Sequence, residues 1–252
     1  MQKYLLNNIK ISVLSIEELI FHLEKYLNTE SSNEIITTFN LDFLRISEYD
    51  EQFREICKNS ILNLPDGIGI TSLLKLKYKV HVKRITGNDI FPIILRLAKK
   101  LNLKVAIVGG SELTSKKVNE KIINEINISK DNLLCLSPEQ NFEFNKEKNN
   151  KVVTMVTEFK PDIVFAALGC PRQEKWLHKY ISNFGSKLNV GIGATLDFYS
   201  GEKKRSPEII QRIGLEWLWR LFQEPKRLFS RYVINDIPFY SKYTLEIILH
   251  KK

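Results

Sequence analysis

Short apolar runs alternate along the chain with longer segments in which apolar residues recur every three or four positions. The short runs predict β-strands at Glu34–Phe39, Ile61–Leu64, Lys104–Val108, Asn132–Leu136, Asp162–Leu168 and Lys187–Ile192. The longer segments predict amphipathic helices at Ile16–Leu27, Asp42–Lys58, Asp89–Leu101, Ser115–Ile126, Lys148–Phe159 and Gln173–Asn183. This alternation favours an α/β fold with a Rossmann-like, mainly parallel sheet flanked by helices.

The pattern becomes purely helical after Ser206. Ile209, Ile213 and Trp217 recur at four-residue spacing, and Pro225 interrupts the periodicity before apolar residues resume. We therefore predict an α/β core over residues 1–200 and a C-terminal helical appendage over residues 201–252.

The composition is that of a globular protein with excess positive charge. The chain has 252 residues, of which 43% are hydrophobic, and a formal net charge of +9. Residues 202–252 hold eleven Lys and Arg against six Asp and Glu. Such a tail indicates a polyanionic partner, either nucleic acid or an anionic membrane surface.

The sequence also limits where the protein works. It has no run of about 18 apolar residues and no charged leader before an apolar stretch, so we expect neither a spanning helix nor a signal peptide. Cys57, Cys135 and Cys170 lie far apart and without a nearby His at ligand spacing, which favours reduced cytosolic thiols over disulfides or zinc. We expect a cytoplasmic protein whose membrane contact is peripheral, at the inner face.

Glycine-bearing polar loops follow several predicted strands, at Leu64–Ile70 (LPDGIGI), Leu168–Trp176 (LGCPRQEKW) and Val190–Pro207 (VGIGATLDFYSGEKKRSP). Glycine lets a backbone approach a ligand closely, and clustered cations beside free N–H groups suit phosphate. The loops therefore predict one phosphate-bearing ligand site. The residues predicted to contact a nucleotide are Gly109, Gly110, Gly169, Gly191, Gly193 and Asp197.

Asp66 is a candidate catalytic residue. It follows an apolar run in the turn Pro65-Asp66-Gly67, which can hold a general base rigidly at a cleft. From these three residues alone, an ordinary turn with no catalytic role is the favoured interpretation. Thr38 and Asn40, at the end of another predicted strand, offer a hydroxyl and an amide for substrate, although capping of the next helix is the favoured role on the residues alone.

Arg84 and Gln173 are the other predicted substrate-binding residues. The Arg84 guanidinium can hold a phosphate, or it can form a surface ion pair with Asp89. Gln173 offers a ligand both a hydrogen-bond donor and an acceptor, while Arg172, Glu174 and Lys175 are expected to form a solvated first helical turn. Cys170 is expected to be a small neighbour rather than a nucleophile, because no His is near it in the sequence.

Arg220, Arg227 and Arg231 are spaced so that they fall on roughly one side of a helix or a broken helix pair. Such a face is often simply solvated. The opposite flank is rich in aromatics, however, and cations beside exposed aromatics suit a helix in a lipid headgroup layer. These arginines are predicted to contact either a ligand diphosphate or the membrane.

The number, order and spacing of these blocks resemble the WecG/TagA/CpsF family of bacterial glycosyltransferases. The likeness extends over roughly residues 9 to 235 and includes TTFNLDFL, RITGND, IVGG and GLEWLWRLFQEPKRLFSRY. It implies transfer of a sugar, commonly N-acetylmannosamine, from a UDP-sugar donor to a sugar on an undecaprenyl-diphosphate carrier, in teichoic acid or surface polysaccharide synthesis. N-acetylmannosamine uronic acid, glucose and galactose remain alternative donor sugars.

The resemblance also implies residue roles. Asp66 matches the family's proposed base, which makes it the predicted catalytic residue. Thr38 and Asn40 match the family's substrate-contacting motif. A Gln stands at the position of Gln173, where it can hydrogen-bond a uracil edge or a sugar hydroxyl. The family's C-terminal appendage is thought to dock on the membrane and to bring arginine to the active site. With no Asp-x-Asp in the sequence, we expect a transfer that needs no metal, and no cofactor is expected. Inversion is expected from the single candidate base and from the family resemblance.

Other classes of function fit the sequence less well. A nucleic-acid binder would leave the glycine loops without a purpose, and the tail contains no known nucleic-acid module, so we expect no nucleic-acid partner. An NAD-dependent enzyme would need a full glycine fingerprint followed by an acidic residue, and neither is convincing. A homo-oligomer remains possible.

Overall fold

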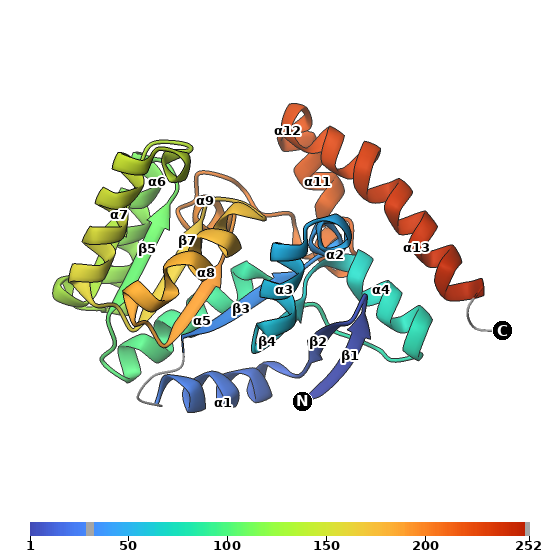
Figure 1. Ribbon diagram of the computed structural model, residues 1–252, viewed down its shortest axis with the longest axis horizontal. Coiled ribbons are helices and arrows are strands. Elements are labelled where there is room, and N and C mark those ends of the chain that lie inside the picture. Colours follow the sequence, from blue (N-terminus) through green and yellow to red (C-terminus); the bar gives the residue numbers. More distant parts are fainter. Residues whose placement is uncertain (29–32, 250–252) are drawn as a thin grey trace.

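The fold is organised around one parallel sheet (Figure 1). The computed structural model describes residues 1–28 and 33–249. In these residues a six-stranded sheet has the order β4-β3-β8-β7-β5-β6, and each strand pair is parallel. The strands are β3 (Glu34–Phe39), β4 (Leu62–Pro65), β5 (Val105–Gly109), β6 (Leu133–Leu136), β7 (Ile163–Ala167) and β8 (Leu188–Gly191). The predicted fold class and all six predicted strands are confirmed.

Helices cover both faces of the sheet. They are α1 (Ile16–Leu27), α2 (Leu41–Tyr49), α3 (Glu51–Asn59), α4 (Gly67–Tyr78), α5 (Gly87–Lys100), α6 (Glu112–Lys121), α7 (Lys146–Phe159), α8 (Arg172–Phe184) and α9 (Thr195–Tyr199). Alternate strand residues serve opposite layers: Val105 and Ile107 pack in the core that contains α1 and α5, and Ala106 and Val108 pack with α7 and α8.

Two helix predictions were wrong in detail. The segment Asp42–Lys58 is not one helix, because Asp50 has an extended backbone and caps the second helix by accepting a hydrogen bond from the Phe53 N–H at 3.0 Å. The segment Ser115–Ile126 is α-helical only to Lys121, since Ile122–Ile126 forms a π-helical turn.

The sequence analysis missed α4 and an N-terminal hairpin. In the hairpin, β1 (Gln2–Leu6) pairs antiparallel with β2 (Ile9–Val13) through a turn at Asn7 and Asn8, both with positive φ. Its apolar residues Leu6, Ile9 and Ile11 are fully buried beside β4 and α4.

The C-terminal segment is helical, as predicted. It contains α10 (Glu208–Arg212), α11 (Glu216–Gln223), α12 (Pro225–Phe229), a π-helical turn (Ser230–Asp236) and α13 (Ile237–Leu249), and Pro225 does start a new helix. In Figure 1, α13 runs beside α4, while α2 contacts the π-helical turn that precedes α13. Tyr240 joins it to the core, because its hydroxyl lies 2.8 Å from the Ser72 hydroxyl. Within the described residues, no helix is both long and apolar enough to cross a membrane.

Gly109, at the end of β5, has a φ of +121°. A Cβ placed there would lie 2.6 Å from the Ala167 carbonyl oxygen of the neighbouring strand β7. The sheet itself therefore requires glycine at this position, whatever the ligand.

We predict that Gly109→Ala lowers the free energy of unfolding by about 3 kcal/mol, because it combines backbone strain with a clash against a fixed carbonyl. Urea unfolding measures the change. Gly201→Ala is the matched control: Gly201 also has a positive φ, but a Cβ there meets nothing within 4 Å, so a loss of about 1 kcal/mol is expected. Equal losses in the two variants would contradict this account.

Candidate active site

A cavity of about 500 Å³ opens at the carboxyl ends of β3, β4 and β8. The loops after these strands and after β7 form its floor. The C-terminal segment forms one wall, with Glu216, Trp217 and Arg220 among the lining residues. Ligand sites of open α/β sheets lie at this edge of the sheet. The cavity is therefore built from parts of the chain that are far apart in the sequence.

Most of the predicted site residues meet in this cavity. The residues that line it include Thr38, Asn40, Asp66, Arg84, Gly169, Gln173, Gly193, Arg220, Arg227 and Arg231. The other four predicted residues, Gly109, Gly110, Gly191 and Asp197, are not among its lining residues. Asp197 forms an ion pair with Lys203 at 2.8 Å, and a Cβ at Gly191 would lie 2.3 Å from a Glu174 carboxylate oxygen. A nucleotide contact by these four stays a prediction.

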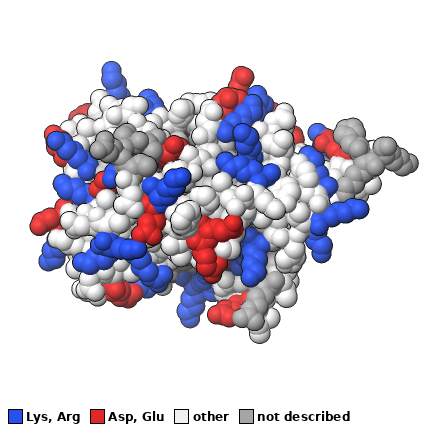
Figure 2. Space-filling model, turned by 90° about the horizontal axis from the view of Figure 1, so that it is seen from below, with Lys and Arg blue, Asp and Glu red and all other residues white. Residues whose placement is uncertain are grey.

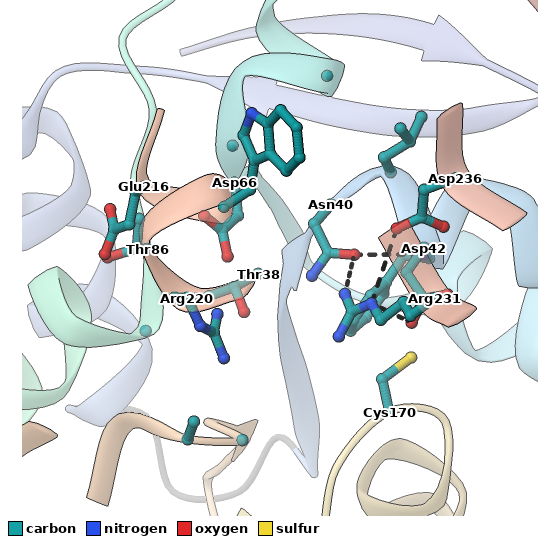
Figure 3. Close-up of a pocket in the computed structure, with 18 of the residues that line it drawn as sticks. Thr38, Asn40, Asp42, Asp66, Thr86, Cys170, Glu216, Arg220, Arg231 and Asp236 are labelled. Carbon is teal, nitrogen blue, oxygen red and sulfur yellow. Dashed lines mark hydrogen bonds and ion pairs between the residues drawn. The ribbon is translucent and has the colours of Figure 1, made fainter. Parts of the chain in front are cut away.

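Asp66 lies at the first position before α4, but its side chain makes no capping hydrogen bond. Its backbone N–H donates to the Phe39 carbonyl at 2.9 Å, which fixes the turn to the end of β3. Desolvation raises the pKa of Asp66 to about 7, although Arg220 and Arg84 oppose this rise. Figure 3 shows the Asp66 carboxyl near Glu216, Thr86 and Arg220.

Thr38 and Asn40 come from β3 and the residue after it. Thr38 faces the cavity, whereas Thr37 points to the other side of the strand and donates to Asn63 at 2.6 Å. The Asn40 side chain caps α2 by accepting from the Phe43 N–H at 3.2 Å, so the capping alternative is confirmed. Because Asn40 also lines the cavity, capping does not remove it from the site.

Gln173 ties two glycine loops together. Its side-chain oxygen accepts the Gly169 N–H at 3.1 Å and the Gly193 N–H at 3.0 Å, and its amide donates to Glu174 at 2.6 Å. The expectation of a solvated first turn was wrong for Glu174, which is fully buried and whose pKa burial raises to about 7. Gln173 thus positions the cavity floor with hydrogen bonds inside the protein.

Arg231 forms ion pairs with two carboxylates, Asp42 and Asp236, that the sequence analysis did not select as site residues. Its Nε lies 3.1 Å from Asp42 and 3.7 Å from Asp236, and Arg45 contacts both carboxylates as well. Figure 3 shows this cluster beside Asn40 and Cys170. Asp42 and Asp236 are far apart in the sequence, so no local pattern indicated that they would meet.

The other arginines of the cavity differ in how far they are neutralised. Arg84 pairs with Glu216 at 2.5 Å rather than with Asp89, which instead caps α5 with Thr86. Arg227 pairs with Glu224 at 2.7 Å. Arg220 lies over the Phe198 ring, and its buried Nε has no hydrogen-bond partner among the described residues. An unpartnered guanidinium aimed into a cavity suits an anionic ligand.

The thiol of Cys170 is protonated in this site. Burial, with Glu174 nearby, raises its pKa well above the usual value. A protonated thiol is a poor nucleophile, which agrees with the expectation that Cys170 is a neighbour and not a reactive group.

The Asp66 carboxyl has a pKa near neutral pH and lies beside guanidiniums at the end of a parallel sheet. Such an arrangement suits acid–base chemistry on an anionic ligand. The sequence comparison agrees, because the sequence model of the family described as "Glycosyl transferase WecG/TagA/CpsF family" matches residues 4–252. The chain belongs to this family.

Similar curated proteins come from Bacillus and Staphylococcus species. The chain is 29% identical over 255 residues to the N-acetylglucosaminyldiphosphoundecaprenol N-acetyl-beta-D-mannosaminyltransferase of Bacillus subtilis (strain 168), covering 100% of this chain and 93% of that protein. A protein of the same name from Bacillus spizizenii is 27% identical, with the same coverage. One from Staphylococcus aureus (strain MRSA252) is 23% identical, with 88% of each chain covered.

We predict that Gln173→Ala lowers the free energy of unfolding by about 3 kcal/mol, because two backbone N–H groups lose their shared acceptor. Urea unfolding without ligand measures this. The control is Gln223→Ala at an exposed glutamine, where a change below about 0.5 kcal/mol is expected. An unchanged stability in Gln173→Ala would show that Gln173 serves the ligand alone.

Proposed function

We propose that this family member transfers N-acetylmannosamine from a UDP donor to N-acetylglucosamine on undecaprenyl diphosphate, for teichoic acid or surface polysaccharide synthesis. The observation that carries the proposal is the desolvated Asp66 carboxyl beside Arg220 in the cavity. The names of the relatives supply the sugar and the acceptor. Donors carrying N-acetylmannosamine uronic acid, glucose or galactose remain the alternative within the same chemistry.

Asp66 acts as the general base. A hydroxyl of the acceptor sugar attacks the anomeric carbon of the donor and gives its proton to the Asp66 carboxylate as the new C–O bond forms. The bond between the anomeric carbon and the UDP oxygen breaks, and UDP leaves with the electron pair. Direct displacement by one base inverts the anomeric centre.

The departing diphosphate needs positive charge, and the cavity provides guanidiniums. Arg84 and Arg220 both interact electrostatically with Asp66, so they lie close to the reacting atoms. Arg227 lines the same cavity. These side chains are proposed to stabilise the leaving group in place of a metal ion.

The C-terminal segment is proposed to rest on the inner face of the membrane, where the lipid-linked acceptor is found. Large apolar side chains of this segment are exposed, among them Phe222, Phe229, Leu245 and Leu249. Positive side chains are spread over the surface with negative ones among them, as the face in Figure 2 shows. Peripheral attachment would therefore rely on insertion of apolar side chains as well as on charge.

The test of this function is transfer by the purified chain from UDP-N-acetylmannosamine to a short-chain diphosphate-linked N-acetylglucosamine, followed by mass spectrometry. Asp66→Asn should lower turnover about 100-fold or more, because the base is lost, while UDP binding survives. Asp131→Asn, at an exposed carboxylate, is the control and should transfer at the wild-type rate. A near wild-type rate in Asp66→Asn would assign Asp66 to an ordinary turn.

The rate should also depend on pH. Because only the ionised Asp66 can accept a proton, kcat/KM is expected to rise through an apparent pKa of about 7 and to fall about tenfold per pH unit below it. Glu174 has a similar pKa, so the profile of Glu174→Gln separates the two groups. A limb that disappears in Glu174→Gln would contradict the assignment to Asp66.

Chelation should leave the activity almost unchanged, because guanidiniums supply the charge that a metal would supply. The measurement is initial rate with and without EDTA. An enzyme that loses activity in EDTA and recovers with Mn²⁺ or Mg²⁺ would refute the metal-independent mechanism.

A further inference from the structure

The Glu216 carboxylate lies between two guanidiniums at the wall of the cavity. One of its oxygens accepts from Arg84 Nη1 at 2.5 Å, and the other accepts from Arg205 Nε at 3.3 Å. Arg84 precedes α5, Arg205 follows α9, and Glu216 starts α11. The side chain of Glu216 is only 13% exposed.

Both arginines have further partners that do not involve Glu216. Arg84 Nη2 donates to Gln211 at 3.3 Å. Arg205 donates to Asp89 and to Thr86, each at 3.4 Å. The two guanidiniums would therefore keep their places if the Glu216 carboxylate moved away.

Two guanidiniums that face separate oxygens of one anion form the arrangement in which arginine binds phosphate. Glu216 and Asp89 together balance Arg84 and Arg205, so the cluster is neutral as it stands. Removal of Glu216 would leave one uncompensated positive charge beside Asp66 and Arg220. A phosphate carries more negative charge than a carboxylate, so its attraction to the two guanidiniums would be stronger than that of Glu216.

We propose that Glu216 stands in for a phosphate group and that Arg84 and Arg205 bind the diphosphate of the ligand once it displaces this carboxylate. Arg205 then becomes a diphosphate-binding residue, and Glu216 becomes an internal competitor that lowers the apparent affinity. This inference rests on the proposed function, because that function makes the ligand a diphosphate.

The other role open to Glu216 is that of a brace, which only fastens α11 to the core. The two roles predict opposite signs. If Glu216 competes with the ligand, its removal tightens anion binding. If Glu216 only fastens α11, its removal displaces Arg220 on the same helix and weakens anion binding.

The experiment is calorimetric titration of the full chain with UDP and with inorganic pyrophosphate. Glu216→Gln, which keeps the shape but loses the charge, should bind both about tenfold more tightly than wild type. In the Glu216→Gln background, Arg205→Ala should return the affinity for pyrophosphate about tenfold toward the wild-type value. Weaker or unchanged binding in Glu216→Gln, or no effect of Arg205→Ala, would overturn the inference.

A charge-matched control separates competition from a general change in net charge. Glu202→Gln also removes one carboxylate, from an ion pair with Lys117. Its affinity for pyrophosphate should equal that of wild type, and a gain as large as that of Glu216→Gln would overturn the inference. Should Glu216→Gln fail to fold, Glu216→Asp replaces it, since a shorter carboxylate cannot span both guanidiniums, and the same tightening is expected. A wild-type chain that binds neither UDP nor pyrophosphate would refute the proposed function itself.

Discussion

The desolvation of the Asp66 carboxyl is the constraint on which the rest of the site depends. A carboxylate that is partly withdrawn from water is unfavourable, and nearby cations offset part of this free energy. The Asp66 N–H donates to the Phe39 carbonyl at the end of β3, which fastens the turn to the sheet. Arg84 and Arg220 then favour the ionised form while Glu216 disfavours it, and the resulting pKa of about 7 suits a base that must both accept and release a proton.

This constraint also explains why the C-terminal segment is part of the site. Arg220 belongs to α11, and its position depends on contacts that fasten the whole segment to the core. Arg231 supplies one such contact, through Asp42 and Asp236, and Tyr240 supplies another at Ser72. Removing one partner from a buried group of charges leaves the others uncompensated, at a cost of about 3 kcal/mol or more. The segment that is proposed to meet the membrane therefore also completes the cavity around the base.

The sequence predicted the features that depend on local pattern and missed those that depend on distant contacts. The alternation of apolar runs and amphipathic segments located all six strands of the sheet, and Thr38 and Asp66 were proposed because they lie at the ends of strands that meet at one edge. Arg84 was proposed because a guanidinium can hold a phosphate. The burial of Glu174 could not be read from a polar first turn, and the meeting of Asp42 with Arg231 has no local signal. Gly109 was assigned to a nucleotide, although the packing of β5 against β7 already requires it.

The most direct test of the central claim is infrared difference spectroscopy of the carboxyl groups, comparing the wild type with Asp66→Asn between pH 3 and 9. The difference isolates Asp66 from Glu174, whose pKa is similar. A protonated-carboxyl band that is present in the wild type, absent in Asp66→Asn and lost with a midpoint near pH 7 is the expected result. A band already lost near pH 4, the ordinary value for Asp, would show that Asp66 is solvated and would contradict the account.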